Sequence, residues 1–188
     1  MDALAALHNR VSVGVLTDPA PSAEQRDNIF RAALRAADHG NLRPWRFLVI
    51  EGQARNRLGE IYLQASEAAA GESLPQAQRE RTLSMPLRAP LVLVAVTRLQ
   101  EHPKVPFEEQ RMSTAGAVQA MLTAAFAQGV GAYWRTGALA ENRDVARALG
   151  LADNEEISGF IYMGTPAKPP RPAPELAVAD FFAGWAGE

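Results

Sequence analysis

Residues 32–50 read Ala-Ala-Leu-Arg-Ala-Ala-Asp-His-Gly-Asn-Leu-Arg-Pro-Trp-Arg-Phe-Leu-Val-Ile, and the rest of the chain is organised around them. The stretch begins as the end of an amphipathic helix and finishes as an apolar strand. Gly40 can adopt the positive φ that ends a helix, and Pro44 favours extended backbone at Arg43. A plain connection needs only glycine and small polar residues. This one is richer, so we predict a ligand site at the mouth of an α/β layer, built from Arg35, Asp38, His39, Asn41, Arg43 and Trp45.

The composition describes an ordinary globular protein. The 188 residues are 47% hydrophobic and 21% charged, which predicts a single domain over residues 1–188 with a core of its own. A net charge of −2 argues against a nucleic-acid partner. Cysteine is absent, which excludes disulfides and thiolate chemistry. We find neither a signal-peptide pattern nor an apolar run long enough to span a membrane, and we therefore expect a cytoplasmic protein without membrane contact.

The flanking sequence alternates helical and strand-like segments. Ser22 and Gln25 form a capping-box pattern that opens the helix leading into residues 32–50. Residues 91–96 form a continuous apolar run, typical of a central strand buried on both faces. Three or four short strands surrounded by helices indicate an α+β or α/β sandwich. The polar stretch 71–87 is expected to be a partly helical excursion that is mobile or covers the site. The further expected elements are helices at 3–9, 52–70, 108–128 and 142–149 and strands at 47–51 and 157–163.

Two segments suggest an assembly. The helix expected at 108–128 is apolar on all sides and rich in small residues, so it is either a central core helix, a helix that packs on its twin in a dimer, or both. The C-terminal arm, residues 166–188, starts with a proline-rich stretch and ends in an apolar tip. Such a tip should pack on its own domain or on a partner subunit.

Two short patterns suggest phosphate binding. In extended chain, Arg10 and Ser12 point to the same side and can clamp a phosphate; alternatively, Arg10 is a helix C-terminal arginine beside a turn serine. Trp134-Arg135-Thr136-Gly137 offers a cation, a hydroxyl and backbone N–H groups; alternatively, Arg135 is a strand arginine paired with a carboxylate.

Other well-known sites are missing from the sequence. The glycines at 129 and 131 lack the rest of a dinucleotide-binding fingerprint, and no P-loop or nucleophile elbow occurs. His8, His39 and His102 lie far apart without ligand spacing, so we expect no metal.

In their order along the chain, five motifs resemble the nitroreductase family, and in particular a short, minimal subgroup of it. They are Arg10-x-Ser12, Pro44-Trp45-Arg46-Phe47, Arg88-Ala89-Pro90, Gly129-x-Gly131-x-x-Trp134-Arg135-x-Gly137 and Gly164-x-Pro166. The resemblance implies an α+β three-layer sandwich with a mostly antiparallel central sheet. It also implies an entwined homodimer with FMN at the subunit interface, and a two-electron ping-pong cycle from NADH or NADPH to a small-molecule electron acceptor.

The resemblance assigns roles to particular residues. Arg10, Val11 and Ser12 match the stretch that holds the phosphate and ribityl chain of FMN. Trp134, Arg135 and Thr136 match a second FMN-contacting stretch of the same subunit. Arg35 and His39 match positions that reach the flavin of the other subunit, and residues 124–129 match a proposed nicotinamide-binding stretch. Because the flavin carries the redox chemistry, no catalytic protein acid or base is implied.

The chain also departs from the family pattern. Val11 replaces a second basic residue, and Gly14 and Val15 occupy positions that often carry a cation near the flavin. Reduced flavin carries negative charge that a nearby cation stabilises, so the cation here must come from elsewhere, such as Arg35 of the partner subunit. Two alternatives therefore stay open: a flavin-binding carrier or sensor without robust reductase activity, and a flavin dehydrogenase or dehalogenase that does not act on nitro groups.

Overall fold

The computed structural model describes residues 1–187 as an α+β fold around one five-stranded sheet. The strands are β1 (Leu16–Thr17), β2 (Trp45–Glu51), β3 (Leu91–Arg98), β4 (Gly131–Arg135) and β5 (Glu155–Pro166). The helices are α1 (Ala3–Asn9), α2 (Ala23–Ala33), α3 (Ala54–Ala70), α4 (Gln76–Ser84), α5 (Phe107–Ala127), α6 (Ala138–Glu141) and α7 (Arg143–Ala148), and the 3₁₀ turns are η1 (His39–Asn41), η2 (Met85–Arg88) and η3 (Val178–Asp180).

The sheet is antiparallel throughout. Strand β3 pairs with β2 along one edge and with β5 along the other, while β4 and β1 both pair with β5. Every residue of β3 except the last is buried, which confirms the prediction of a central strand covered on both faces. Because both faces of β3 are covered, this antiparallel strand lacks the usual alternation of apolar and polar residues.

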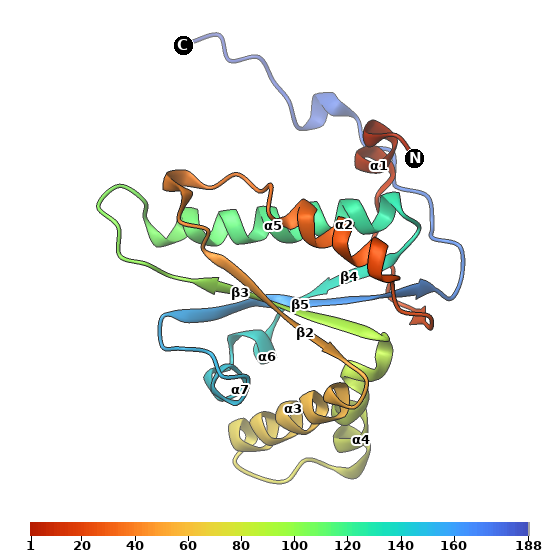
Figure 1. Cartoon of the computed structure of the whole chain (residues 1–188), viewed down its shortest axis with the longest axis vertical. Helices are drawn as coiled ribbons and strands as arrows, with labels where there is room; N and C mark the ends of the chain where they lie inside the picture. The colour runs from red at the N-terminus through yellow and green to blue at the C-terminus, as the bar shows by residue number, and fades with distance from the viewer. Residues whose placement is uncertain (188) are drawn as a thin grey trace.

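Helices cover the two faces of the sheet and give three layers (Figure 1). Helices α2 and α5 lie on one face, and α3, α4, α6 and α7 lie on the other. Two separate apolar cores fill the spaces between these layers, one around Leu93 and Met121 and the other around Val94 and Leu58. The predicted α+β three-layer sandwich is therefore confirmed.

The turn after α2 differs from its prediction in two ways. The helix ends at Ala33, well before Gly40, because Arg35 and Ala36 already donate to carbonyls three residues back and close tight turns. Gly40 does adopt a positive φ of 76°, but inside η1. Arg43 is not extended: its φ is 50°, and its backbone N–H donates to Asp38 Oδ2 at 2.7 Å, which holds the turn closed before Pro44.

The segment 71–87 is partly helical, as predicted, and its helix α4 packs against α3. The C-terminal arm leaves β5 and runs away from the sandwich past α1 (Figure 1). Its apolar residues, including Phe182 and Trp185, are 76% and 89% exposed, so the arm does not pack on its own domain. Residue 188 of the arm lies outside the described residues.

Candidate functional site

The predicted phosphate-binding segment lies between two strands. Arg10 ends α1, and the chain then runs along β4, where the Val13 N–H donates to the Ala132 carbonyl at 2.9 Å. Two residues on, the Val15 carbonyl accepts from Ala167 N–H at 3.1 Å, directly after β5. The segment is thereby held in place by backbone bonds on both sides, which leaves the Ser12 side chain exposed.

A cleft of about 490 Å³ opens beside this segment; we call it the Ser12 cleft. One wall is the chain from Val11 to Val15, and the other is the segment Lys168-Pro169-Pro170-Arg171 that follows β5. No carboxylate lines the cleft. Within residues 1–187, Arg10, Lys168 and Arg171 form no ion pair. A hydroxyl between unpaired cations is suited to binding a phosphate.

Sequence reasoning missed Lys168 and Arg171. Both lie in the proline-rich arm, where cations between prolines look like ordinary solubilising residues of a connector. The available signal was that two basic residues stand close together directly after a strand that ends in Gly164-Thr165-Pro166. Only the pairing of that strand with β1 brings them opposite Ser12.

Alternation along β4 sends the predicted residues Trp134 and Arg135 to opposite faces of the sheet. Trp134 packs in the core under α5, and its indole N–H donates to the Ser158 carbonyl at 3.1 Å. The Arg135 guanidinium lies 4.3 Å from the centre of the Tyr133 ring, and its Nε is buried without a hydrogen-bond partner. Within residues 1–187, Arg135 forms no ion pair with a carboxylate, contrary to the alternative interpretation.

Tyr133 connects the two predicted phosphate-binding patterns. A Cβ placed on Gly14 would lie 3.4 Å from the Tyr133 ring, so the backbone at Gly14 rests against this ring. Arg135 stacks on the same ring. The structure thus brings the segment containing Arg10, Val11 and Ser12 next to the strand that carries Arg135 and Thr136.

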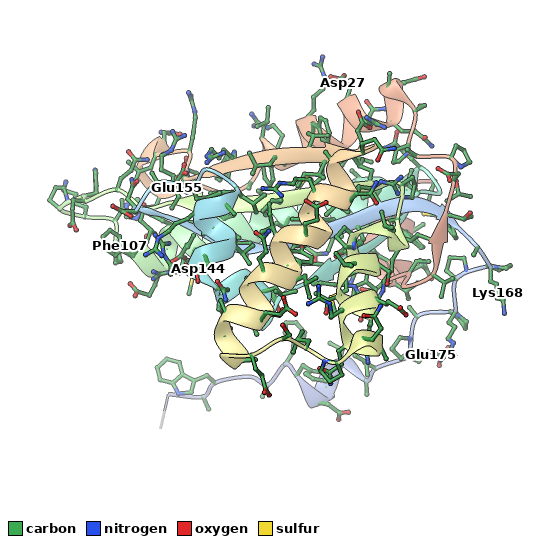
Figure 2. The ribbon with its side chains drawn as sticks, turned by 90° about the horizontal axis from the view of Figure 1, so that it is seen from below. Asp27, Phe107, Asp144, Glu155, Lys168 and Glu175 are labelled. Atoms are coloured by element: carbon green, nitrogen blue, oxygen red, sulfur yellow. The ribbon has the colours of Figure 1, made fainter. Side chains whose placement is uncertain are left out.

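Arg35 and His39 lie elsewhere in the chain. His39 Nδ1 is 2.5 Å from the Glu109 carboxylate in the first turn of α5, and Arg35 is exposed at the rim of a depression of about 220 Å³ with Asp38 and Arg43. The Ser12 cleft is near the other end of α5, because Val13 and Phe126 line one small cavity. Seventeen residues of helix separate Glu109 from Phe126, or about 25 Å. Figure 2 shows Phe107, at the start of α5, and Lys168 on opposite sides of the molecule. Within one chain, Arg35 and His39 do not reach the Ser12 cleft.

Two further observations concern metal sites and membrane spans. Within residues 1–187, no three His, Asp or Glu side chains gather where they could hold a metal ion. In the same part of the chain, no helix has the length and hydrophobicity needed to cross a membrane.

The chain matches known proteins over most of its length. The model of the "Nitroreductase family" matches residues 7–165. The chain is 45% identical over 166 residues to a protein of Escherichia coli (strain K12) named "Putative NAD(P)H nitroreductase YdjA", which covers 88% of this chain and 89% of that protein. The crystal structure of a nitroreductase-like family protein from Bacillus cereus superposes with a TM-score of 0.82 at 20% identity and covers 100% of this chain and 97% of that one.

A second solved structure has the same fold. It is a nitroreductase with bound FMN from Bacteroides fragilis, with a TM-score of 0.72, 20% identity and coverage of 98% of this chain and 99% of that one. The family match and the identity to the Escherichia coli protein, together with the shared sandwich, establish that this chain belongs to the nitroreductase family.

Proposed function

We propose that the protein is an FMN-dependent oxidoreductase that takes two electrons from NADH or NADPH and passes them, in a ping-pong cycle, to a nitroaromatic, a quinone or a similar acceptor. Bound FMN would supply the redox chemistry. The chain's own residues bind and orient it, exclude water and balance its charge.

The Ser12 cleft is the observation that supports this proposal most. Its exposed hydroxyl and its unpaired cations fit the phosphate of a mononucleotide, and no carboxylate opposes an anion there. We propose that Arg10, Ser12, Lys168 and Arg171 bind the phosphate of FMN. Val11 lies between Arg10 and Ser12 and would contact FMN through its backbone. Trp134 would orient β4, and Arg135 and Thr136 would face the cofactor.

The position of Arg35 and His39 supports a shared site. Both lie too far from the Ser12 cleft to act on a cofactor held by the same chain, yet both lie on the outside of the sandwich where a second copy can dock. We therefore propose a homodimer in which these two residues of one protomer reach the FMN bound by its partner.

One observation favours a second candidate, a flavin-binding carrier or sensor. The backbone at Gly14 rests against the Tyr133 ring, and Val15 is 69% exposed, so neither position brings a cation to the flavin. Without such a cation, reduction by NADH or NADPH would be less favourable. Arg135 stacks on the same tyrosine and so brings a cation close to this segment, which favours the enzyme.

Two measurements test the proposal. Purified protein should be yellow, and denaturation should release FMN; protein that stays colourless in excess FMN would rule out both candidates. Anaerobic NADH or NADPH should then bleach the flavin, and a nitroaromatic or quinone should restore the colour. Bleaching by dithionite but by neither nicotinamide would favour the carrier or sensor.

A further inference from the structure

A second cavity, of about 340 Å³, lies on the face of the sheet covered by α3 and α4. Three arginines line it from three elements: Arg81 of α4, Arg88 of η2 and Arg135 of β4. We call it the triple-arginine pocket. Tyr62 of α3 and Tyr162 of β5 also line it, and no carboxylate does.

None of the three arginines has a carboxylate partner within residues 1–187. Other arginines near carboxylates do pair, as Arg46 does with Glu155 at 2.6 Å and Arg111 with Glu156 at 2.6 Å. Arg81 and Arg88 are exposed to water, which screens their charges, but three guanidinium groups around one cavity still make its electrostatic potential positive. The arrangement therefore favours a negatively charged ligand.

Two buried polar atoms in the pocket lack hydrogen-bond partners. They are the hydroxyl of Tyr62, whose side chain is 1% exposed, and Nε of Arg135. Buried polar groups without partners destabilise a fold, so such groups usually mark a place where a ligand or ordered water binds. Both atoms are N–H or O–H groups that can donate to an anion.

The tyrosine hydroxyls remain donors at neutral pH. Burial raises the pKa of Tyr62, and the neighbouring Tyr162 raises it further. Burial likewise raises the pKa of Tyr162, although the neighbouring Tyr62 hydroxyl, Arg135 and Arg88 oppose this effect. A protonated phenol donates to a carboxylate or phosphate, whereas a phenolate would repel it. Met85, Leu139 and Phe160 add an apolar wall that suits the body of a small organic molecule.

We propose that the triple-arginine pocket binds the carboxylate or phosphate group of a small molecule with an apolar body. Arg135 and Thr136 belong both to this pocket and to the stretch assigned to FMN. If the protein has the proposed function, this ligand is the electron acceptor. The pocket then selects acceptors that carry an anionic group.

Direct binding tests the pocket without any redox reaction. Calorimetric titration of FMN-loaded protein with benzoate, and separately with inorganic phosphate, should show binding of at least one. Arg88→Gln should weaken it at least tenfold, and Arg88→Lys, which keeps the charge, should weaken it less. Arg147→Gln is the matched control, because Arg147 is exposed on α7 and pairs with Asp144. Tighter binding of phosphate than of benzoate would identify the phosphoryl group as the ligand.

Three results would overturn the pocket assignment: no binding of either probe, binding that is insensitive to Arg88→Gln, and binding that FMN saturation abolishes. The last would mean that the pocket holds the phosphate of FMN itself. Because these titrations also work on FMN-free protein, a failure of the proposed function would be recognised separately, as an absence of flavin binding or reduction.

Steady-state kinetics test the acceptor. The anionic acceptor para-nitrobenzoate should saturate the enzyme at a lower concentration than the neutral para-nitrobenzamide. Arg88→Gln should raise the KM for the acid at least tenfold more than the KM for the amide. Equal changes for both acceptors would assign Arg88 a merely structural role and overturn the acceptor preference.

Discussion

Cations without carboxylate partners mark the places where this chain can bind negative charge. Lys168 and Arg171 face Ser12 across a cleft, and Arg81, Arg88 and Arg135 surround a separate pocket. An unpaired surface cation costs little free energy because water solvates it, so the chain can keep such residues ready for a ligand. Their grouping in two cavities without carboxylates is what points to function.

Lys168→Ala and Arg10→Ala should each weaken FMN binding about tenfold or more, because a charge-assisted hydrogen bond contributes roughly 1.5–3 kcal/mol. Titration of apoprotein with FMN, followed by quenching of flavin fluorescence, measures the loss. Lys104→Ala is the matched control, since this exposed lysine lies in the loop before α5. Equal effects of the two lysine substitutions would contradict the assignment of Lys168 to the phosphate.

Glu155 carries a structural rather than a functional charge. Its carboxylate accepts hydrogen bonds from Arg46 at 2.6 Å and from the Ala152 N–H at 3.0 Å. The Arg46 hydrogen bond, against the cost of burial, lowers the pKa of Glu155 from its ordinary 4.5 to about 2. Because the folded-state pKa is the lower one, the stabilisation is present above about pH 4.5 and is lost as pH falls toward 2.

Glu155→Gln should therefore lower the free energy of unfolding at pH 7 by about 3 kcal/mol, the low end for a buried ion pair that loses one partner. The deficit relative to wild type should shrink between pH 4.5 and 2. Urea unfolding at several pH values measures both. Glu156→Gln, whose Arg111 pair is more exposed, should cost no more than about 1 kcal/mol. A pH-independent difference between Glu155→Gln and wild type would disprove the linkage.

Among the elements, the end of β4 depends on close contact with β5. Gly159 has a φ of 146°, and a Cβ there would lie 2.1 Å from Trp134 Nε1 and 2.8 Å from the Arg135 carbonyl. β5 is also irregular here, where its register with β3 shifts between Ala95 and Val96. Glycine at this position lets the indole approach the backbone and donate to Ser158.

Gly159→Ala should therefore displace Trp134 and move Arg135 and Thr136 with it, lowering both thermal stability and FMN affinity. A blue-shift or red-shift in tryptophan fluorescence and a lower Tm would report the displacement. Ser73→Ala is the control, because Ser73 is exposed in the loop between α3 and α4 and the change should leave Tm unaltered. An unchanged FMN affinity in a folded Gly159→Ala protein would show that β4 does not position the cofactor.

At the scale of the whole molecule, one chain leaves several large apolar side chains exposed. Leu4 and Leu7 of α1, Met112 of α5, and Phe182 and Trp185 of the arm are all more than half exposed. Exposed apolar groups of this size mark an interaction surface. We predict a dimer whose interface exceeds the standard size of roughly 1,600 Å² and resembles a domain core.

Sedimentation analysis should show a dimer that survives dilution, because an obligate interface leaves no stable monomer. Removing residues 175–188 should weaken the dimer and reduce FMN binding with it, since both depend on the same interface. A stable monomer that still binds FMN tightly would refute the shared site.

Subunit mixing tests which chain supplies Arg35. Arg10→Ala and Arg35→Ala homodimers should each bind FMN poorly. If Arg35 acts on the partner's flavin, each heterodimer carries one site with both lesions and one intact site, so mixing should restore part of the binding. No recovery after confirmed subunit exchange would place Arg35 and Arg10 at the same site of one chain.

The sequence by itself determined the elements and their order. The apolar run 91–96, the Ser22 capping box and the helix expected at 108–128 all appear in the structure where local pattern placed them, because these features depend on residues close in sequence. The family resemblance was also correct, since motifs in a fixed order survive where overall identity falls. Local pattern was misleading at Arg43, where a bond from its backbone to Asp38 overrides the preference of a residue before proline.

Only the tertiary structure decided which distant residues meet. Sequence spacing cannot show that Lys168 faces Ser12, that Arg81 and Arg88 join Arg135 around one pocket, or that Arg35 and the Ser12 cleft lie near opposite ends of α5. Each of these relations depends on strand pairing and on the side of the sheet to which a residue points, and a shift of one residue in register would reverse that side. The sequence shows which residues are charged. The cavities that these residues line form only when β1 and β4 pair with β5.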